Sequence, residues 1–228
     1  MTAEAPAIEV VGLTKSYGDH TVLNGVDLTV PEGTVYALLG PNGAGKTTIV
    51  NILSTLLAPG DGEIRVAGFD ARREPGQVRS RIGVTGQFSA IDELLTGREN
   101  LRLMADLAHL DRPTATATVT EMLQRFDLVA AADRRAQTYS GGMKRRLDLA
   151  MTLITRPRLI FLDEPTSGLD PRSRRDLWSI VREQVADGVT VLLTTQYLEE
   201  ADQLADRIGV LDGGRLVAEG TAAELKRR

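Results

Sequence analysis

The chain has 228 residues, of which 42% are hydrophobic and 25% charged, a composition typical of a folded globular protein with one large domain or two small lobes. Its formal charge of -4 gives no electrostatic reason to expect a nucleic-acid partner, and the absence of cysteine excludes disulfides and thiolate metal sites. The apolar runs are far shorter than the roughly 20 residues of a membrane-spanning helix, and residues 1–6 show no signal peptide. We therefore expect a cytoplasmic protein that serves a membrane, if at all, as a peripheral subunit.

Alternating apolar residues predict β-structure near the start of the chain. Residues 8–10 and 22–30 alternate between apolar and polar side chains, with turns expected at Asp19-His20 and Asn24-Gly25. Residues 34–39 form a continuous apolar run, which is typical of a strand buried on both faces of a parallel sheet.

Residues 40–47, with the sequence GPNGAGKT, match the phosphate-binding pattern G-x-x-x-x-G-K-[ST]. Glycines suit this loop because backbone N–H groups must approach phosphate oxygens closely, and the start of the following helix adds partial positive charge. In this chemistry Lys46 contacts the β- and γ-phosphates, and the Thr47 hydroxyl binds Mg²⁺. The alternative is an ordinary glycine-rich turn, but the loop lies between a buried strand and a helix expected to begin near Lys46, as phosphate binding requires.

The period of the apolar residues becomes helical between Thr96 and about Phe126. Thr96 and Glu99 have the spacing of a capping box, and apolar stripes follow over residues 101–108 and 119–126. Two helices without a strand between them predict a helical insertion in an α/β domain.

The sequence Ser-Gly-Gly at residues 140–142 precedes a further helical stripe, from Met143 to Ile154. Ser140 and the glycine N–H groups are expected to form a second anion-binding helix start. The alternative is a simple N-cap with a flexible turn. The basic run at residues 144–146 is interpreted as a solvated helix face.

Residues 159–164, with the sequence LIFLDE, form an apolar strand that ends in two carboxylates. Because α/β sheets place ligands at the carboxyl ends of their strands, we expect Asp163 to hold Mg²⁺ through water. Glu164 would polarise an attacking water as general base. The alternative, a solvated pair at a strand end, is disfavoured by the phosphate-binding loop.

The alternation of helix and strand continues to the end of the sequence. A helix near residues 174–185 is expected before a second buried strand at 189–194. Asp212-Gly213-Gly214 predicts a hairpin, and Thr221 with Glu224 caps a last short helix.

In this order and spacing, the motifs resemble those of the ATPase subunits of ABC transporters over essentially the whole chain. Residues 40–47 resemble Walker A, and residues 159–164 resemble Walker B with its catalytic glutamate. Residues 140–142 resemble the ABC signature, although Tyr139 and Met143 replace the usual Leu and Gln.

The resemblance implies an α/β fold, a P-loop NTPase core of ABC type with an antiparallel N-terminal β-lobe and an inserted helical subdomain. One ABC ATP-binding domain is expected over residues 1–228, with the helical subdomain at about residues 92–150. Two copies would pack head to tail, each ATP lying between the phosphate loop of one copy and the signature of the other.

Three further positions take their roles from the resemblance, and each has a simpler alternative. Gln87 falls at the Q-loop but is otherwise a solvated loop amide. Tyr17 stands where the family stacks an aromatic ring on adenine but is otherwise a core or strand side chain. Asp170, in the D-loop sequence of residues 167–170, is followed by Pro171 and is therefore also a good N-cap.

Gln196 is a departure from the family, which usually has a His there that contacts the γ-phosphate. Within the family, residues 194–197 and 84–89 look like the daunorubicin/doxorubicin-resistance exporter ATPases. A glutamine keeps a hydrogen-bond donor but cannot carry a charge; the alternative is a position without a role. Exporter subunits of this kind usually have a further C-terminal region that this sequence lacks.

The resemblance thus implies ATP and Mg²⁺ as cofactors, with three sets of residues. The catalytic residues are Glu164, Gln196 and Lys46. Mg²⁺ would be held by Thr47, Gln87 and Asp163. ATP would be bound by Tyr17, Gly40, Pro41, Asn42, Gly43, Ala44, Gly45, Lys46, Thr47, Thr48, Ser140, Gly141, Gly142 and Asp170.

The leading function is ATP hydrolysis that powers export of a hydrophobic, drug-like substrate through separate transmembrane permease subunits, on the inner face of the cell membrane. The alternative is a non-transport ABC ATPase that acts on ribosomes or DNA. Such proteins usually carry two cassettes or long coiled-coil insertions, and this chain shows one cassette, no heptads and no basic excess. An inactive regulatory module is disfavoured because Lys46, Asp163 and Glu164 are intact.

Overall fold

The computed structural model describes residues 5–86 and 90–227, which form two compact units. The first unit contains residues 5–86, 157–165 and 181–227, and the second contains residues 90–156 and 166–180. In the described residues of both units, no helix has the length and apolar character needed to cross a membrane.

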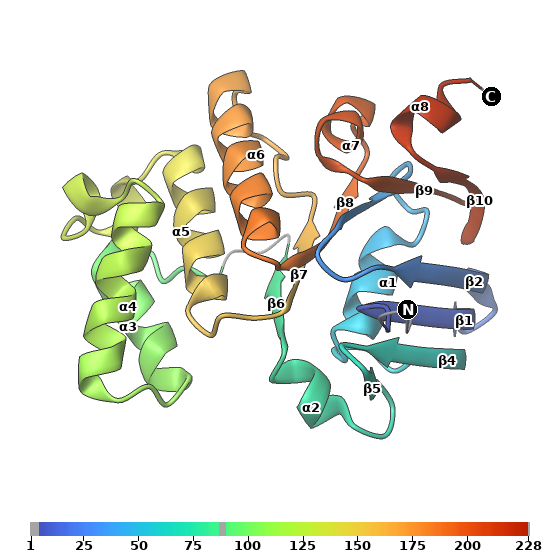
Figure 1. The fold of residues 1–228 in the computed structure, drawn as a ribbon, viewed down its shortest axis with the longest axis horizontal. Helices are drawn as coiled ribbons and strands as arrows, with labels where there is room; N and C mark the ends of the chain where they lie inside the picture. Colours follow the sequence, from blue (N-terminus) through green and yellow to red (C-terminus); the bar gives the residue numbers. More distant parts are fainter. Residues whose placement is uncertain (1–4, 87–89, 228) are drawn as a thin grey trace. The chain divides into compact units, whose positions relative to one another are not determined.

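An antiparallel sheet opens the first unit, as the alternating pattern predicts (Figure 1). Its strand order is β2-β1-β4-β5, with β1 at Ile8–Tyr17, β2 at His20–Val30, β4 at Asp61–Val66 and β5 at Phe69–Asp70. The turn expected at Asp19-His20 lies one residue earlier, at Gly18-Asp19. The turn expected at Asn24-Gly25 is wrong, because both residues lie inside β2, where Gly25 has a φ of 73° beside a register shift.

A second, mostly parallel sheet carries the chemistry of the first unit. Its order is β10-β9-β3-β8-β7-β6. The strands are β3 at Val35–Leu39, β6 at Ile82–Thr85, β7 at Leu159–Asp163, β8 at Thr190–Thr195, β9 at Arg207–Asp212 and β10 at Arg215–Gly220. Only β10 pairs antiparallel, through the predicted hairpin with β9. The predicted α/β class with an antiparallel lobe is confirmed.

Helices and a shared core hold the two sheets of this unit together. The helices wholly inside it are α1 at Lys46–Leu53, α2 at Pro75–Arg79, α7 at Leu198–Leu204 and α8 at Ala222–Leu225. One buried apolar cluster includes Val26 of the antiparallel sheet, Ile49 of α1 and Phe161 of the parallel sheet. Burial of this cluster fixes the start of α1 at the end of β3.

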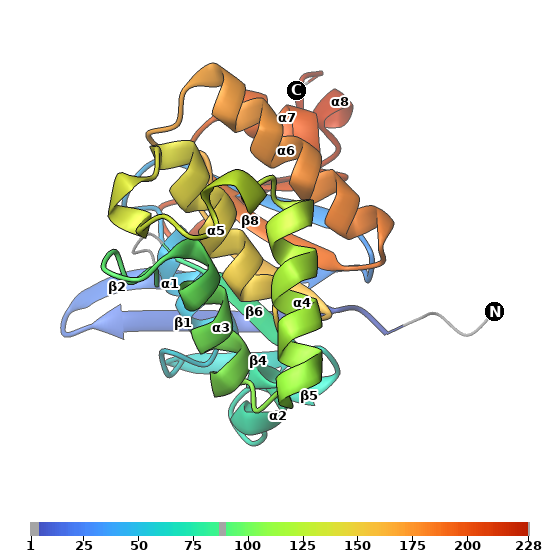
Figure 2. The same ribbon diagram turned by 90° about the vertical axis from the view of Figure 1, so that its left-hand side faces the viewer.

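The second unit is helical (Figure 2). It contains α3 at Gly97–Leu107, α4 at Arg112–Arg125, two 3₁₀ turns at Val129–Ala131 and Ala136–Thr138, α5 at Gly141–Leu153, and the first part of α6, which spans Pro171–Ala186. The capping box of Thr96 and Glu99 is present at the start of α3, and α3 packs against α4 and α5. The predicted helical insertion is therefore confirmed.

Candidate active site

The loop between β3 and α1 is fixed by backbone contacts at both ends. The Gly40 N–H donates to the Thr195 carbonyl over 3.1 Å, and a Cβ at Gly40 would lie 2.3 Å from the Leu211 carbonyl oxygen. Gly45 is the N-cap of α1 with a φ of 106°, a backbone conformation that residues with side chains rarely adopt. The fold of the loop itself therefore requires both glycines.

Lys46 lies inside this loop rather than in solvent, with only 5% of its surface exposed. Its ammonium group donates to the carbonyls of Gly40 at 2.8 Å and Pro41 at 3.0 Å, and lies 3.5 Å from Glu164 Oε1. Thr47 and Thr48 follow in the first turn of α1 and are half-buried. The loop carbonyls therefore hold the Lys46 ammonium inside the loop.

The two carboxylates leave the end of β7, a strand whose five residues are all buried. Asp163 is 3% exposed and accepts a hydrogen bond from the Thr194 hydroxyl. Glu164 has a φ of 48°, in the left-handed region, and its backbone N–H donates to the carbonyl and the hydroxyl of Thr194, each at 3.1 Å. The structure therefore brings Lys46, Asp163 and Glu164 together at the carboxyl ends of β3 and β7.

Gln196 follows β8, which lies between β3 and β7 in the sheet. Its side chain is exposed, and the Tyr197 N–H donates to the Thr195 hydroxyl at 3.0 Å, which closes a short turn around Gln196. Gln196 therefore stands at the same sheet edge as the phosphate loop and the carboxylates. Gln87, the other amide singled out in the sequence, lies outside the described residues.

Tyr17 ends β1 and is 51% exposed, so of the simpler alternative, a core or strand side chain, only the strand reading fits. The Lys15 ammonium lies 5.3 Å from the centre of the Tyr17 ring and donates to the Ala58 carbonyl at 2.7 Å. An exposed ring with a cation on it is available for stacking.

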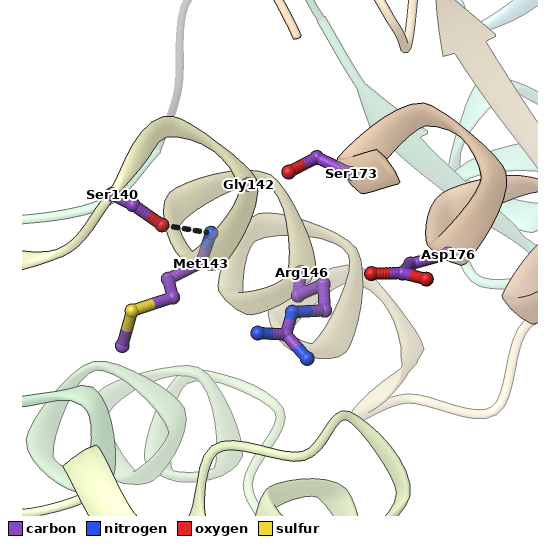
Figure 3. A pocket seen from close by; sticks show the side chains of 6 residues that line it. All are labelled: Ser140, Gly142, Met143, Arg146, Ser173 and Asp176. Atoms are coloured by element: carbon purple, nitrogen blue, oxygen red, sulfur yellow. Dashed lines mark hydrogen bonds between the residues drawn. The ribbon is translucent and has the colours of Figure 1, made fainter. Parts of the chain in front are cut away.

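In the second unit, Ser140 is the N-cap of α5, and its hydroxyl accepts from the Met143 N–H at 3.3 Å (Figure 3). The expected helix start is therefore confirmed, and it is capped by its own side chain. A small hollow surrounds it, lined by Ser140, Gly142, Met143, Arg146, Ser173 and Asp176.

Asp170 caps α6, as its pairing with Pro171 predicts. Its carboxylate accepts from the N–H groups of Arg172 and Ser173, each at 3.0 Å, and from the Ser173 hydroxyl at 2.6 Å. The hydrogen bond from the Ser173 side chain is the main cause that lowers the pKa of Asp170. Ser173 also packs on α5, because a Cβ at Gly142 would lie 2.5 Å from its hydroxyl oxygen.

The basic run at residues 144–146 is not a simple solvated face, which corrects the sequence interpretation. All three side chains are half-buried and form ion pairs inside the second unit. Lys144 pairs with Glu93, Arg145 with Asp148 at 3.2 Å and Arg146 with Asp127 at 3.0 Å. These cations are therefore partly neutralised by carboxylates of the same unit.

Tyr139, which replaces the usual Leu before the Ser-Gly-Gly sequence, is a buried side chain with a defined partner. Its hydroxyl donates to the Ala131 carbonyl at 2.7 Å, and burial raises its pKa. A Cβ at Gly97 would lie 2.2 Å from the same hydroxyl, so Tyr139 requires a glycine at the start of α3. The sequence shows the replacement, but nothing in it predicts the hydrogen bond with Ala131.

The phosphate loop after a buried parallel strand, with carboxylates ending a strand of the same sheet, defines a P-loop nucleoside triphosphatase. Residues 23–167 match the family described as "ABC transporter". The chain is 59% identical over 220 residues to the Daunorubicin resistance ATP-binding protein DrrA3 of Streptomyces coeruleorubidus. This match covers 96% of this chain and 70% of that protein.

Two further comparisons agree. The chain is 45% identical over 214 residues to the Nod factor export ATP-binding protein I of Rhizobium meliloti (strain 1021), covering 94% of this chain and 64% of that protein. A solved "Structure of ATP binding subunit of ABC transporter" matches with a TM-score of 0.85 and 31% identity, covering 97% of this chain and 92% of that one. The chain therefore belongs to the ABC transporter family, as an ATP-hydrolysing subunit.

Proposed function

We propose that two copies of this chain form a head-to-tail dimer whose ATP hydrolysis powers export through separate transmembrane permease subunits. The observation that carries this proposal is the division of the phosphate-binding features between two compact units. The first unit holds Lys46 and the carboxylates, and the second holds an independent helix start at Ser140. Two copies could use both features on each ATP.

In the proposed site, the backbone from Gly40 to Thr48 and the Lys46 ammonium bind the phosphates of ATP. The Lys46 ammonium lies inside the loop, where it donates to two carbonyls and lies 3.5 Å from Glu164, so a phosphate oxygen would compete with these acceptors. Tyr17 stacks on the adenine. The exposed ring and the buried cation support this assignment.

The residues present also fit a magnesium ion. No cluster of three or more His, Cys, Asp or Glu side chains occurs among residues 5–86 and 90–227 that could hold a metal alone. Mg²⁺ usually takes one or two carboxylates together with phosphate oxygens and water, and the buried Asp163 offers one such carboxylate. Asp163 and the Thr47 hydroxyl would hold it, with Gln87 as a third proposed ligand. When bound, Mg²⁺ neutralises charge on the phosphates.

Glu164 is the proposed general base, because it lies beside Lys46 at the sheet edge where the γ-phosphate would end. Its side chain is 14% exposed, so it reaches water while it stays anchored by its backbone. Gln196 would donate a hydrogen bond to the γ-phosphate. The same γ-phosphate would be faced from the opposite side by four residues of the second copy, namely Ser140, Gly141, Gly142 and Asp170.

The names of the relatives support a membrane partner and an exported cargo. The names of the two relatives refer to daunorubicin resistance and to Nod factor export, so export is the activity that they suggest for this chain. We propose a hydrophobic, drug-like cargo that contacts the permease, and a position for this chain on the cytoplasmic face of the membrane.

The molecular mass of the nucleotide-bound protein in solution tests the proposed dimer. The Glu164→Gln variant with ATP and Mg²⁺ should elute from gel filtration at twice the monomer mass with two ATP bound. The matched control, Glu164→Gln combined with Lys46→Ala, should remain a monomer. A monomeric Glu164→Gln protein at saturating ATP would contradict the dimer.

The permease is tested by affinity purification from detergent-solubilised membranes of the source cells. A tagged chain should retain a protein with several membrane-spanning helices, and its ATPase rate should change when that protein is added back. Retention of ribosomes or DNA in place of a membrane protein would contradict the export proposal.

A further inference from the structure

Thr194, the fifth residue of β8, contacts both residues of the carboxylate pair. It is completely buried, and its hydroxyl donates to Asp163 Oδ1 while it accepts from the Glu164 N–H at 3.1 Å. A threonine hydroxyl has one donor and two acceptor sites, so it can make both hydrogen bonds at once. The Thr194 carbonyl accepts from the same Glu164 N–H, also at 3.1 Å.

Thr194 follows three apolar residues of β8 and precedes a second buried threonine, Thr195. β8 continues from Val191 through Leu193, all buried, and Asp163 is the direct partner of Thr194 in the parallel register. A buried hydroxyl costs free energy unless it is hydrogen-bonded, and a valine would fill the same space without that cost. Packing alone therefore does not explain a threonine here.

Glu164 needs such a contact because of its backbone. A φ of 48° is unfavourable for a residue with a side chain and persists only where surrounding contacts hold it. This conformation breaks the extended backbone directly after β7, at the second of the two consecutive carboxylates. The contacts of the Glu164 N–H with Thr194 fix that turn.

We propose that Thr194 is a positioning residue that aligns Asp163 and Glu164 for ATP hydrolysis. Its hydroxyl holds one orientation of the Asp163 carboxylate and steadies the left-handed turn at Glu164. It acts through these two residues and does not itself touch the nucleotide. The inference rests on the proposed roles of the two carboxylates in binding Mg²⁺ and activating water.

The test compares Thr194→Val, which removes the hydroxyl but keeps the shape, with Thr194→Ser, which keeps the hydroxyl. Hydrogen bonds to charged groups are strong enough that Thr194→Val should lower turnover by roughly 10- to 100-fold. It should also raise the Mg²⁺ concentration for half-maximal activity, while the affinity for ATP in EDTA stays the same. Thr194→Ser should keep turnover within about threefold of the original.

The same strand offers a matched control. Thr190 begins β8, is 2% exposed, and its hydroxyl accepts from the Gly33 N–H at 2.9 Å, at the opposite end of the strand from the carboxylates. Thr190→Val should destabilise the fold to a similar degree in thermal unfolding but leave turnover and Mg²⁺ dependence unchanged. Thr194→Ala supplies a second loss of the hydroxyl if Thr194→Val does not fold.

Three results would overturn the inference: unchanged turnover and Mg²⁺ dependence in Thr194→Val and Thr194→Ala, equal losses in Thr190→Val and Thr194→Val, or a Thr194→Ser variant as impaired as Thr194→Val. Asp163→Asn, assayed in the same series, separates this failure from that of the site. If Asp163→Asn loses turnover and Thr194→Val does not, only the positioning role is wrong. If Asp163→Asn hydrolyses ATP normally, the proposed site and the inference are both wrong.

Discussion

The helix starts at Gly45 and at Ser140 both lie in glycine-containing sequences, yet they are built differently. Gly45 caps α1 without a side chain and in a left-handed conformation, so its helix start is open to an external anion. Ser140 caps α5 with its own hydroxyl, which accepts from the Met143 N–H at 3.3 Å. An anion at α5 must compete with, or add to, a cap that is already made.

The cationic side chains near the two helix starts also differ in their partners. Lys46 is buried, donates to two carbonyls of its own loop and lies 3.5 Å from Glu164, whereas the half-buried cations of residues 144–146 pair more closely with carboxylates of the second unit. In the first region the cation thus lies inside the loop that would bind the phosphate. In the second region the cations are paired with carboxylates, so we expect weaker anion binding there. That fits a surface that contacts ATP only when ATP is bound by another copy.

The largest expected effect separates the two regions directly. Ser140→Arg should abolish hydrolysis but leave ATP binding to the monomer intact, whereas Lys46→Ala should weaken binding itself. Because the roles lie in different copies, mixing the two inactive variants in equal amounts should restore up to about a quarter of the activity, through mixed dimers with one intact site. Absence of recovery at every mixing ratio in a phosphate-release assay would argue against the head-to-tail arrangement.

A second variant tests the chemistry of the first region alone. Glu164→Gln should lower turnover by roughly 10²- to 10⁴-fold, because an amide cannot take a proton from water. ATP binding, measured with a fluorescent analogue, should persist because the phosphate contacts lie elsewhere. Turnover near that of the unchanged protein would remove Glu164 from the role of general base.

Gln196 should have a smaller effect at the same sheet edge. Loss of a neutral donor in Gln196→Ala should lower turnover about tenfold, with little change in ADP affinity. Gln196→His should remain active and gain a pH step near the usual histidine pKa of about 6.5, which the original protein lacks. An unchanged rate in Gln196→Ala would leave Gln196 as a plain strand-end residue.

Gly142 tests whether the α5 start depends on the first turn of α6, which packs against it. Gly142→Ala places a Cβ 2.5 Å from the Ser173 hydroxyl oxygen and 2.9 Å from its Cβ, so we expect a several-fold loss of turnover. Adding Ser173→Gly should restore part of it by removing both atoms. Adding Ser173→Ala, which leaves the Cβ, should restore less; equal rescue by both would show that the clash is not the cause.

The smallest effect is expected at Thr96, a helix start in the second unit without a proposed ligand. Thr96→Ala should lower the free energy of unfolding by about 1 kcal/mol and leave turnover unchanged. The backbone N–H of Thr96 lowers the pKa of Glu99, so this contribution of the capping box is present at neutral pH and is lost as the pH falls below the usual glutamate range. Thermal unfolding between pH 7 and pH 3 measures the effect of the substitution and the pH dependence of the capping box.

The sequence alone determined the parts of this protein that depend on local patterns. The glycine loop, the carboxylate strand and the caps at Thr96 and Ser140 each need residues within a few positions of one another, so their spacing was sufficient. Local patterns do not predict β4, β5, β6, α2 or α7, which are short or weakly patterned and are stabilised by pairing or packing with other parts of the chain.

The tertiary structure decided how distant segments act on the site. The Asn24-Gly25 pair has the composition of a turn, but pairing with β1 keeps it inside a strand. Thr194 and Asp163 are 31 residues apart, and nothing in either local sequence predicts their hydrogen bond. The same is true of Tyr139 with Gly97 and of Ser173 with Gly142. Such contacts arise only when strands adopt a register or helices pack, since a side chain meets its partner through the fold and not through its place in the sequence.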